Sequence, residues 1–136
     1  MPSYWILKTE PSEYSFDDLE KEKRTIWDGV TNALALKHIR SMRKGDAAMI
    51  YHTGDEKQIV GLATVASDPY PDPKAEKDAI VVVDVEAEKR LPRPVTLAEI
   101  KADPDFKDLA LVRQGRLSVV PVEERLWQKL LRMAGA

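Results

Sequence analysis

Short stretches of aromatic and β-branched residues recur along the chain, and this composition is typical of β-strands. These stretches lie at residues 4–9, 47–52, 59–66, 80–85 and 116–119. The first of them runs into Glu10-Pro11, and proline has no N–H group to donate to a strand ladder. The pattern therefore predicts strands that are far apart in the chain.

Between these strands the hydrophobic positions take a helical spacing. Ala35, Ile39 and Met42 fall at i, i+4 and i+7, which places them on one face of a helix. Asn32 is a suitable N-cap and Gly45 a suitable stop signal. The sequence predicts a helix between these two residues.

Capping patterns predict shorter helices elsewhere. Ser15 stands three residues before Asp18, and Thr96 stands three residues before Glu99, as in a capping box. Residues 123–133 have the periodicity of a terminal helix. Each of these segments lies between or after the predicted strands.

The remaining segments are expected to be loops. They are a turn-bearing loop at 25–30, a polar turn at 53–58 and a proline-rich loop at 69–73. Non-local strands with inserted helices indicate an α+β fold, built as one domain over residues 1–136. A small closed barrel would pair its strand edges, and a two-layer sandwich would give similar strands.

Composition narrows the possible chemistry. The 136 residues include no cysteine and only two histidines, so neither a disulfide, a metal site nor a cofactor is expected. A net charge of −2 argues against coating nucleic acid by bulk charge, but it is compatible with a pocket that has a local basic rim. The sequence shows neither a signal-peptide pattern nor a membrane-length apolar run, so a cytoplasmic protein without membrane association is expected.

Five segments occur in the order and approximate spacing of a known family. They are Tyr-Trp-Ile-Leu-Lys-Thr-Glu-Pro at 4–11, Trp-Asp-Gly-Val-Thr-Asn at 27–32, Tyr-His-Thr at 51–53, Tyr-Pro-Asp-Pro at 70–73 and Arg-Gln-Gly-Arg-Leu-Ser-Val at 113–119. With these segments the chain resembles the EVE domain family of the PUA-like superfamily. The family commonly has Arg and Ser at the positions that Thr31 and Thr53 occupy here.

The resemblance implies a PUA-like small mixed β-barrel with inserted and flanking helices. It also implies a pocket for a flipped or single-stranded base. Family members are associated with modified cytosine in DNA, and bacterial members with RNA. Nucleic acid, as modified DNA or RNA, is therefore the expected partner, and the expected activity is binding without catalysis.

A base-binding pocket needs a flat apolar wall and polar groups for the edge of the base. Trp27 is the best candidate for the wall, because an indole beside Asp-Gly is hard to bury for packing alone. Trp5 or Tyr51 could form the opposite wall, or both could be core residues. Either arrangement agrees with their positions on strands.

Polar candidates for the base edge stand at the end of the first strand and after Trp27. Lys8, Thr9 and Glu10 could face the pocket, or Lys8 and Glu10 could be a surface ion pair. Asp28 and Asn32 could bind a base or serve as caps. The other predicted base contacts are Gly29, Val30, His52, Leu117 and Ser118.

Basic side chains could hold phosphate at the rim of such a pocket. The candidates are Lys37, Arg40, Arg113 and Arg116, and the alternative for the helix residues is a solvated face. Two other functions stay open. One is an enzyme that processes a small ligand or nucleotide with Glu10 and His52. The other is a homodimeric interaction module that uses the loop at 69–73.

Overall fold

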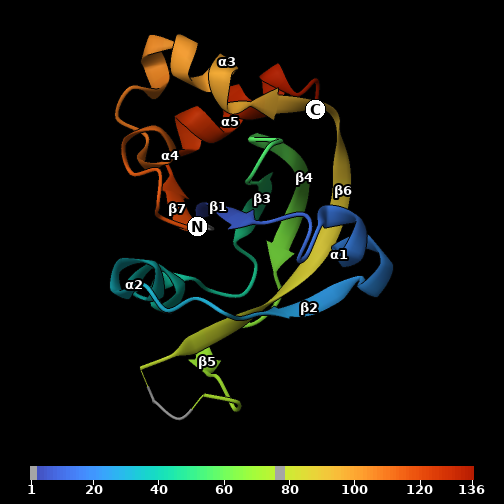
Figure 1. Ribbon diagram of the computed structural model, residues 1–136, viewed down its shortest axis with the longest axis vertical. Helices are drawn as coiled ribbons and strands as arrows, with labels where there is room; N and C mark the ends of the chain where they lie inside the picture. The colour runs from blue at the N-terminus through green and yellow to red at the C-terminus, as the bar shows by residue number, and fades with distance from the viewer. Residues whose placement is uncertain (1–2, 76–78) are drawn as a thin grey trace.

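The computed structural model describes residues 3–75 and 79–136, and these form a mixed α/β fold with a seven-stranded sheet (Figure 1). The strands are β1 (Tyr4–Thr9), β2 (Arg24–Trp27), β3 (Ala47–His52), β4 (Gln58–Val65), β5 (Tyr70–Pro71), β6 (Val81–Thr96) and β7 (Val119–Val122). The helices are α1 (Phe16–Glu22), α2 (Ala33–Ser41), α3 (Leu97–Ala102), α4 (Ala110–Arg113) and α5 (Glu124–Met133), with a 3-10 turn, η1, at Pro104–Phe106.

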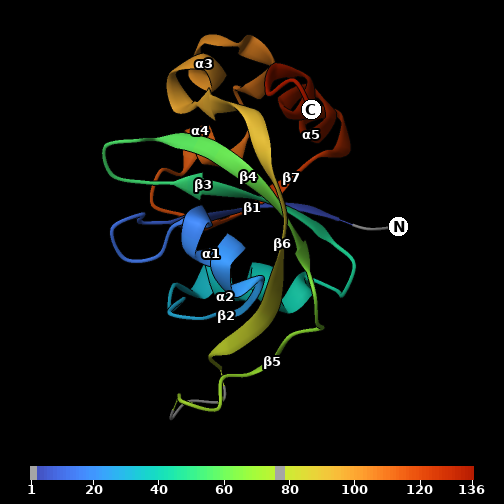
Figure 2. The ribbon, with the colours of Figure 1, turned by 90° about the vertical axis from the view of Figure 1, so that its right-hand side faces the viewer.

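The strands follow the order β2-β6-β4-β3-β1-β7, and β5 is a side branch on β6. β1 pairs in parallel with β3, whereas the other neighbours are antiparallel. Helices α3, α4 and α5 gather at one end of the sheet and α2 lies at the other (Figures 1 and 2). The expected mixture of non-local strands and inserted helices is confirmed.

The sheet is open in its hydrogen bonding. Its path ends at β2 on one side and β7 on the other, and no pairing joins these two strands within the described residues. The closed barrel is therefore not confirmed and stays a prediction.

Capping explains where the helices begin. Ser15 and Asp18 form a complete capping box at α1, and Thr96 and Glu99 form one at α3. Asn32 caps α2, because its side-chain oxygen accepts from the backbone N–H of Ala35 at 3.1 Å. All three predicted helix starts are confirmed.

Several predicted boundaries were wrong. The expected loop at 25–30 begins as strand β2, because β2 pairs with β6 across a separation of about sixty residues. The strand predicted at 80–85 continues to Thr96, and the last strand begins at Val119 instead of Arg116. Helix α2 ends at Ser41, and Gly45 lies in the following turn with a φ of 98°. Neither η1 nor α4 was predicted.

The prolines of β6 and β7 stand at irregular or edge positions of the sheet. The β4–β6 ladder shifts register between Val95 and Arg90, and Pro92 and Pro94 lie in that interval. In β7 the exposed Pro121 stands opposite Trp5 of β1, on a strand whose other edge has no partner among the described residues. Proline removes a donor, so it is tolerated at irregular and edge positions of a sheet.

A single hydrophobic cluster fills the fold, and Phe16 is fully buried within it. The ring of Phe16 lies directly over Gly61 of β4. A Cβ built on Gly61 would stand 2.3 Å from the Cζ atom of Phe16, which is too close for two carbon atoms. Gly61 is therefore required by the packing of α1 on the sheet.

The substitution Gly61→Ala is expected to destabilise the protein by about 1–3 kcal/mol, because the added methyl overpacks the core. Gly115→Ala is the matched control, since a Cβ there meets no atom within 4 Å. Urea denaturation of both variants measures the difference. Equal midpoints would contradict the packing argument.

Candidate functional site

A pocket of about 310 Å³ opens beside Trp27. Its size is near the lower end of the roughly 300–1,000 Å³ range of small-molecule sites. We call it the Trp27 pocket, and it is lined by Thr9, Tyr14, Thr25, Ile26, Trp27, Asp28, Asp72, Pro73 and Lys74.

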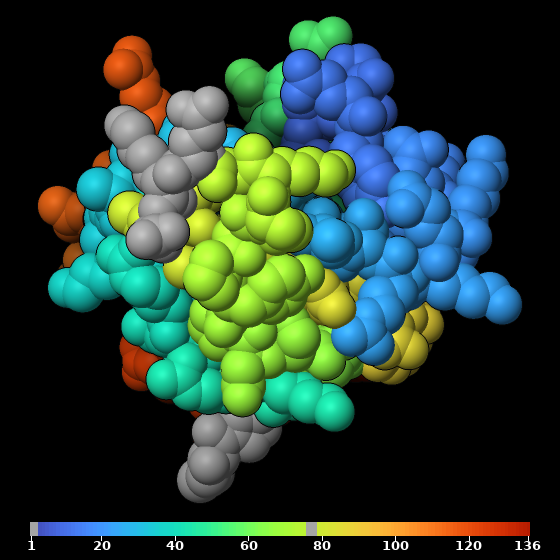
Figure 3. Space-filling view, turned by 90° about the horizontal axis from the view of Figure 1, so that it is seen from below, coloured from blue at the N-terminus to red at the C-terminus, as the bar shows by residue number. Residues whose placement is uncertain are grey.

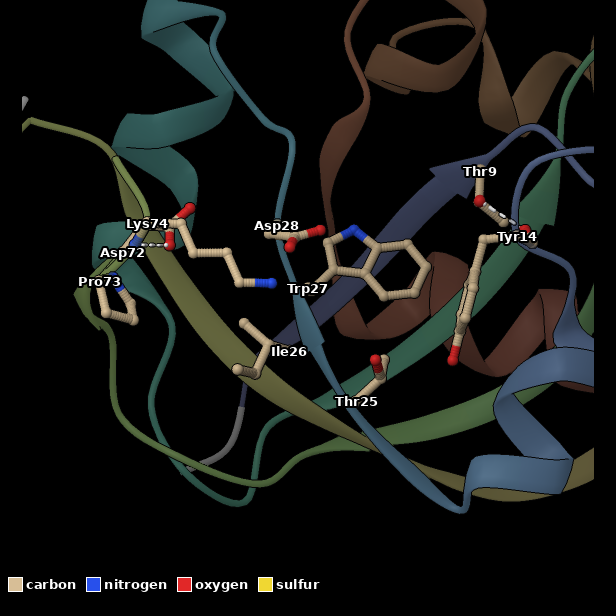
Figure 4. A pocket seen from close by; sticks show the side chains of 9 residues that line it. All are labelled: Thr9, Tyr14, Thr25, Ile26, Trp27, Asp28, Asp72, Pro73 and Lys74. Atoms are coloured by element: carbon tan, nitrogen blue, oxygen red, sulfur yellow. Dashed lines mark hydrogen bonds between the residues drawn. The ribbon is translucent and has the colours of Figure 1, made fainter. Parts of the chain in front are cut away.

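Two segments face each other across this pocket. Strand β2 and Asp28 form one side, and residues 72–74, which follow β5, form the other (Figure 4). We call residues 70–74 the arm. The side chain of Lys74 extends from the arm toward Ile26 and Asp28, so the pocket carries groups of both charges. The arm and β2 lie on the face of the molecule that Figure 3 shows.

Trp27 is fixed in place as part of the pocket wall. Its side chain is only 7 % exposed, and the ring of Tyr14 meets the indole edge-on with centroids 6.2 Å apart and planes at 84°. Edge-to-face pairs of this kind are favourable for aromatic rings. The indole thus belongs to the core and also borders a cavity, which suits a stacking surface.

A carboxylate of β6 fastens both sides of the pocket. One oxygen of Asp84 accepts from the guanidinium of Arg24 on β2 at 2.7 Å, and the other accepts from the hydroxyl of Tyr70 in the arm at 2.6 Å. Both hydrogen bonds lower the pKa of Asp84, and the bond from Tyr70 has the larger effect. The same bond raises the pKa of Tyr70 to about 12.

A second pocket of about 310 Å³ lies beside Arg116. We call it the Arg116 pocket, and its lining is Asn32, Leu34, Gln114, Gly115, Arg116 and Leu117. The loop from Asp28 to Asn32 contributes to both pockets. Arg116 is exposed, so its guanidinium is available to an anionic ligand.

The end of β1 connects the Trp27 pocket with the Arg116 pocket. Thr9 lines the Trp27 pocket, and its hydroxyl donates to the backbone oxygen of Tyr14 at 2.6 Å. Lys8 donates to the backbone oxygen of Gly115, a residue of the Arg116 pocket, at 2.9 Å. The ammonium of Lys8 is 5.7 Å from the ring centre of Tyr51, and burial lowers the pKa of this lysine. Lys8 thus joins β1 to the loop before β7.

Glu10 holds neighbouring loops and is absent from the lining of the Trp27 pocket. Its carboxylate accepts from the backbone N–H and the hydroxyl of Ser12 at 3.2 and 3.0 Å, and from the hydroxyl of Thr53 at 3.3 Å. These bonds lower the pKa of Glu10, with the backbone bond from Ser12 first. The structure does not bring Glu10 to the pocket with Thr9.

Trp5 is a core residue. Its side chain is 5 % exposed, and its indole N–H donates to the buried carboxylate of Asp46 at 3.0 Å. Asp46 also accepts from the backbone N–H groups of Ser3 and Arg43. Of the two readings left open by the sequence, the structure favours packing for Trp5, which lines neither pocket.

Tyr51 and His52 are buried on β3, with 4 % and 5 % exposure. The Nε2 atom of His52 accepts from the backbone N–H of Phe16 at 3.0 Å, so Nδ1 carries the proton and faces Glu56 at 2.9 Å. Both ring nitrogens therefore hold the start of α1 and the β3–β4 turn. Neither residue lines the Trp27 pocket.

Two of the other predicted base contacts line the Arg116 pocket, and three line neither pocket. Asn32 and Leu117 line the Arg116 pocket, and Gly29 has a φ of 79° in the loop between the pockets. Val30 is buried. Ser118 accepts from the backbone N–H of Lys8 through its own carbonyl oxygen at 3.0 Å.

The predicted phosphate-binding residues do not form one cluster. Arg116 is at a pocket, whereas Arg113 pairs with Asp108 at 3.3 Å. Lys37 and Arg40 are exposed on α2, and Arg40 donates to the backbone oxygen of Ala79 at 3.3 Å. Of these four residues, Arg116 is therefore the one that borders the Trp27 pocket or the Arg116 pocket.

Several lining residues were absent from the sequence prediction. They are Tyr14, Thr25, Ile26, Asp72, Pro73 and Lys74. The Tyr-Pro-Asp-Pro motif at 70–73 was a visible signal for the arm. Its position opposite Trp27 depends on both segments pairing with β6, and local periodicity carries no information on that pairing.

The described residues hold no group of three or more His, Asp or Glu side chains suited to a metal ion. None of the helices in this part of the chain has the length and apolar character needed to cross a membrane.

The indole–carboxylate bond of Trp5 can be tested by stability. Trp5→Phe removes the N–H donor to Asp46, and Trp127→Phe changes an equally buried indole for which the described residues provide no hydrogen-bond acceptor. We expect Trp5→Phe to cost roughly 1.5–3 kcal/mol more than the control, the range for a hydrogen bond to a charged group. Chemical denaturation gives both values, and equal losses would contradict the role of Asp46.

Tyr70 should titrate near pH 12, because ionisation breaks the hydrogen bond from its hydroxyl to Asp84 and would place a phenolate beside that carboxylate. The hydrogen bond from Tyr70 to Asp84 therefore stabilises the fold fully below pH 10, the ordinary pKa of a tyrosine. Its contribution is lost as the pH rises through the raised pKa of about 12. Carbon NMR of labelled tyrosine rings, assigned with Tyr70→Phe, follows this titration. Asp84→Asn should shift it toward the ordinary value, and an unchanged midpoint would contradict the assignment.

Comparison with known proteins supplies the wider context. A family model for the EVE domain matches residues 3–133. Thymocyte nuclear protein 1 from Homo sapiens is 27 % identical over 167 residues, covering 98 % of this chain and 74 % of that protein. The same protein from Danio rerio is 29 % identical over 168 residues, with coverages of 97 % and 73 %.

Several solved structures share the fold of this chain. A protein from Rhodopseudomonas palustris aligns with a TM-score of 0.93 and 41 % identity, covering 98 % of this chain and 93 % of that one. Human THYN1 protein, in complex with DNA that contains 5-methylcytosine, aligns with a TM-score of 0.90 and 27 % identity, covering 98 % of both chains.

Proposed function

The chain belongs to the EVE domain family, and from this premise we propose that it is a non-catalytic module that binds a modified nucleobase in DNA or RNA. A modified cytosine is the expected base. The observation that carries the proposal is the Trp27 pocket, a cavity of about 310 Å³ with a fixed indole on one side. The human relative in complex with 5-methylcytosine DNA supports the choice of base.

The polar groups of the pocket suit the edge of a cytosine. The carboxylate of Asp28 can accept from an exocyclic amino group, and the ammonium of Lys74 can donate to a ring nitrogen or carbonyl oxygen. The indole of Trp27 supplies a stacking surface, which accepts any base. Selection of the base is therefore assigned to the polar groups and to the shape of the cavity.

The Arg116 pocket is proposed to hold the strand next to the bound base. Arg116 and Asn32 offer donors to phosphate oxygens, and Gln114 adds an amide. A few such contacts near one pocket agree with a net charge of −2, because the protein need not neutralise a long stretch of phosphates.

A binding role is preferred to catalysis because the predicted acid–base residues are already engaged. His52 holds Phe16 and Glu56 through its two ring nitrogens, and Glu10 holds Ser12 and Thr53. The PUA-like barrel belongs to the same proposal, and the match to the EVE domain family over residues 3–133 supports it. A cytoplasmic location and a homodimer stay predictions from the sequence.

Trp27→Ala is expected to weaken binding to an oligonucleotide with one 5-methylcytosine by roughly 5- to 150-fold, the equivalent of the 1–3 kcal/mol that stacking on one aromatic ring contributes. Fluorescence anisotropy measures the dissociation constants. Trp127→Ala is the control, because it removes another buried indole that does not line either pocket.

Both alanine variants lose core packing, so thermal melts should establish a temperature at which each is folded. The exposed Asp28 provides a variant with little effect on stability, and Asp28→Asn should also weaken binding. Equal affinity of the wild type for modified and unmodified oligonucleotides, set only by salt, would contradict the proposed function.

A further inference from the structure

We infer that Asp84 is a positioning residue: it sets the gap between the two sides of the Trp27 pocket and thereby decides which cytosine derivatives enter. This inference rests on the proposed function of the pocket. It also gives a role in base binding to the Tyr-Pro-Asp-Pro motif of the arm, which the sequence analysis considered only for self-association.

The two sides of the pocket meet on one strand. Trp27 of β2 pairs with Val83 of β6, and Tyr70 of the arm pairs with Val82. Asp84 is the next residue along β6. Its two carboxylate oxygens bind one group from each side, Arg24 at 2.7 Å and the hydroxyl of Tyr70 at 2.6 Å.

The arm depends on this carboxylate because its backbone pairing is short. β5 has two residues, and its ladder with β6 consists of the pairs Tyr70–Val82 and Pro71–Val81. Pro71 has no N–H group to donate. One more backbone hydrogen bond follows, from the N–H of Asp72 to the carbonyl oxygen of Ile80 at 2.9 Å. Pro73 and Lys74 continue beyond it, so the direction in which they leave β6 depends on this short backbone contact and on the anchored ring of Tyr70.

The β2 side is less dependent on Asp84. β2 has four ladder pairs with β6, from Arg24–Glu86 to Trp27–Val83, and its indole packs against Tyr14. Loss of the carboxylate should therefore move the arm relative to a fixed indole. The gap would widen, and the cavity would then accept cytosines with and without a 5-substituent more equally.

The test uses one oligonucleotide sequence with cytosine, 5-methylcytosine or 5-carboxylcytosine at a single position. Dissociation constants are measured for the wild type, Asp84→Asn and Tyr70→Phe. The ratio of the constants for cytosine and 5-methylcytosine should fall roughly tenfold in both variants, as expected for the loss of one hydrogen bond to a charged group. The affinity for the bulkier 5-carboxylcytosine should rise relative to the affinity for 5-methylcytosine.

Glu88→Gln is the matched control. It neutralises another carboxylate on β6 that accepts from a hydroxyl, that of Thr64, and Glu88 lines neither the Trp27 pocket nor the Arg116 pocket. Its ratios should equal those of the wild type. If Asp84→Asn does not fold, Tyr70→Phe decides the test, because it keeps the ring and removes one oxygen atom.

The outcomes separate the two proposals. A wild type without preference among the three oligonucleotides overturns the proposed function. A wild type that discriminates, together with variants that keep its ratios, overturns the role of Asp84 and leaves the function intact. Uniform weakening of all three oligonucleotides at unchanged ratios also overturns the role of Asp84, because a purely structural loss would act in this way.

Discussion

The pairing of β6 with three other strands is the constraint on which the structure depends. Its 16 residues contact β2, β4 and β5, so one strand joins the core to the candidate site. Side chains of a strand alternate between its faces. Val83 and Val85 are buried, and Asp84 between them is the polar group through which β6 reaches Arg24 and Tyr70.

A pocket wall that is also a core residue has a thermodynamic advantage. The indole of Trp27 is held by Tyr14 before any ligand arrives, so little side-chain freedom is lost on binding. Opposite it, Pro73 and Lys74 are exposed and belong to a segment with a short ladder. The structure thus combines a rigid surface for stacking with a side whose position depends on a few polar contacts.

Local signals predicted a large part of the fold. Strands β1 and β3, the capping boxes at Ser15 and Thr96, and the cap at Asn32 are all confirmed, because each is determined by residues close together in the chain. Strand β2 was missed, because its four residues, Arg-Thr-Ile-Trp, depend on a distant partner strand. For the same reason the sequence could nominate Trp27 but could not place Lys74 opposite it, or show that Trp5 donates to Asp46.

Pro121 has a consequence for the open sheet. A strand with a free edge is a template on which another polypeptide can extend the ladder, and this is a common route to aggregation. On β7 the proline removes one of the donors that such an addition would need, and it interrupts a stretch of valines that is otherwise well suited to self-association. The residue thereby disfavours the addition of another strand at the β7 end of the strand order.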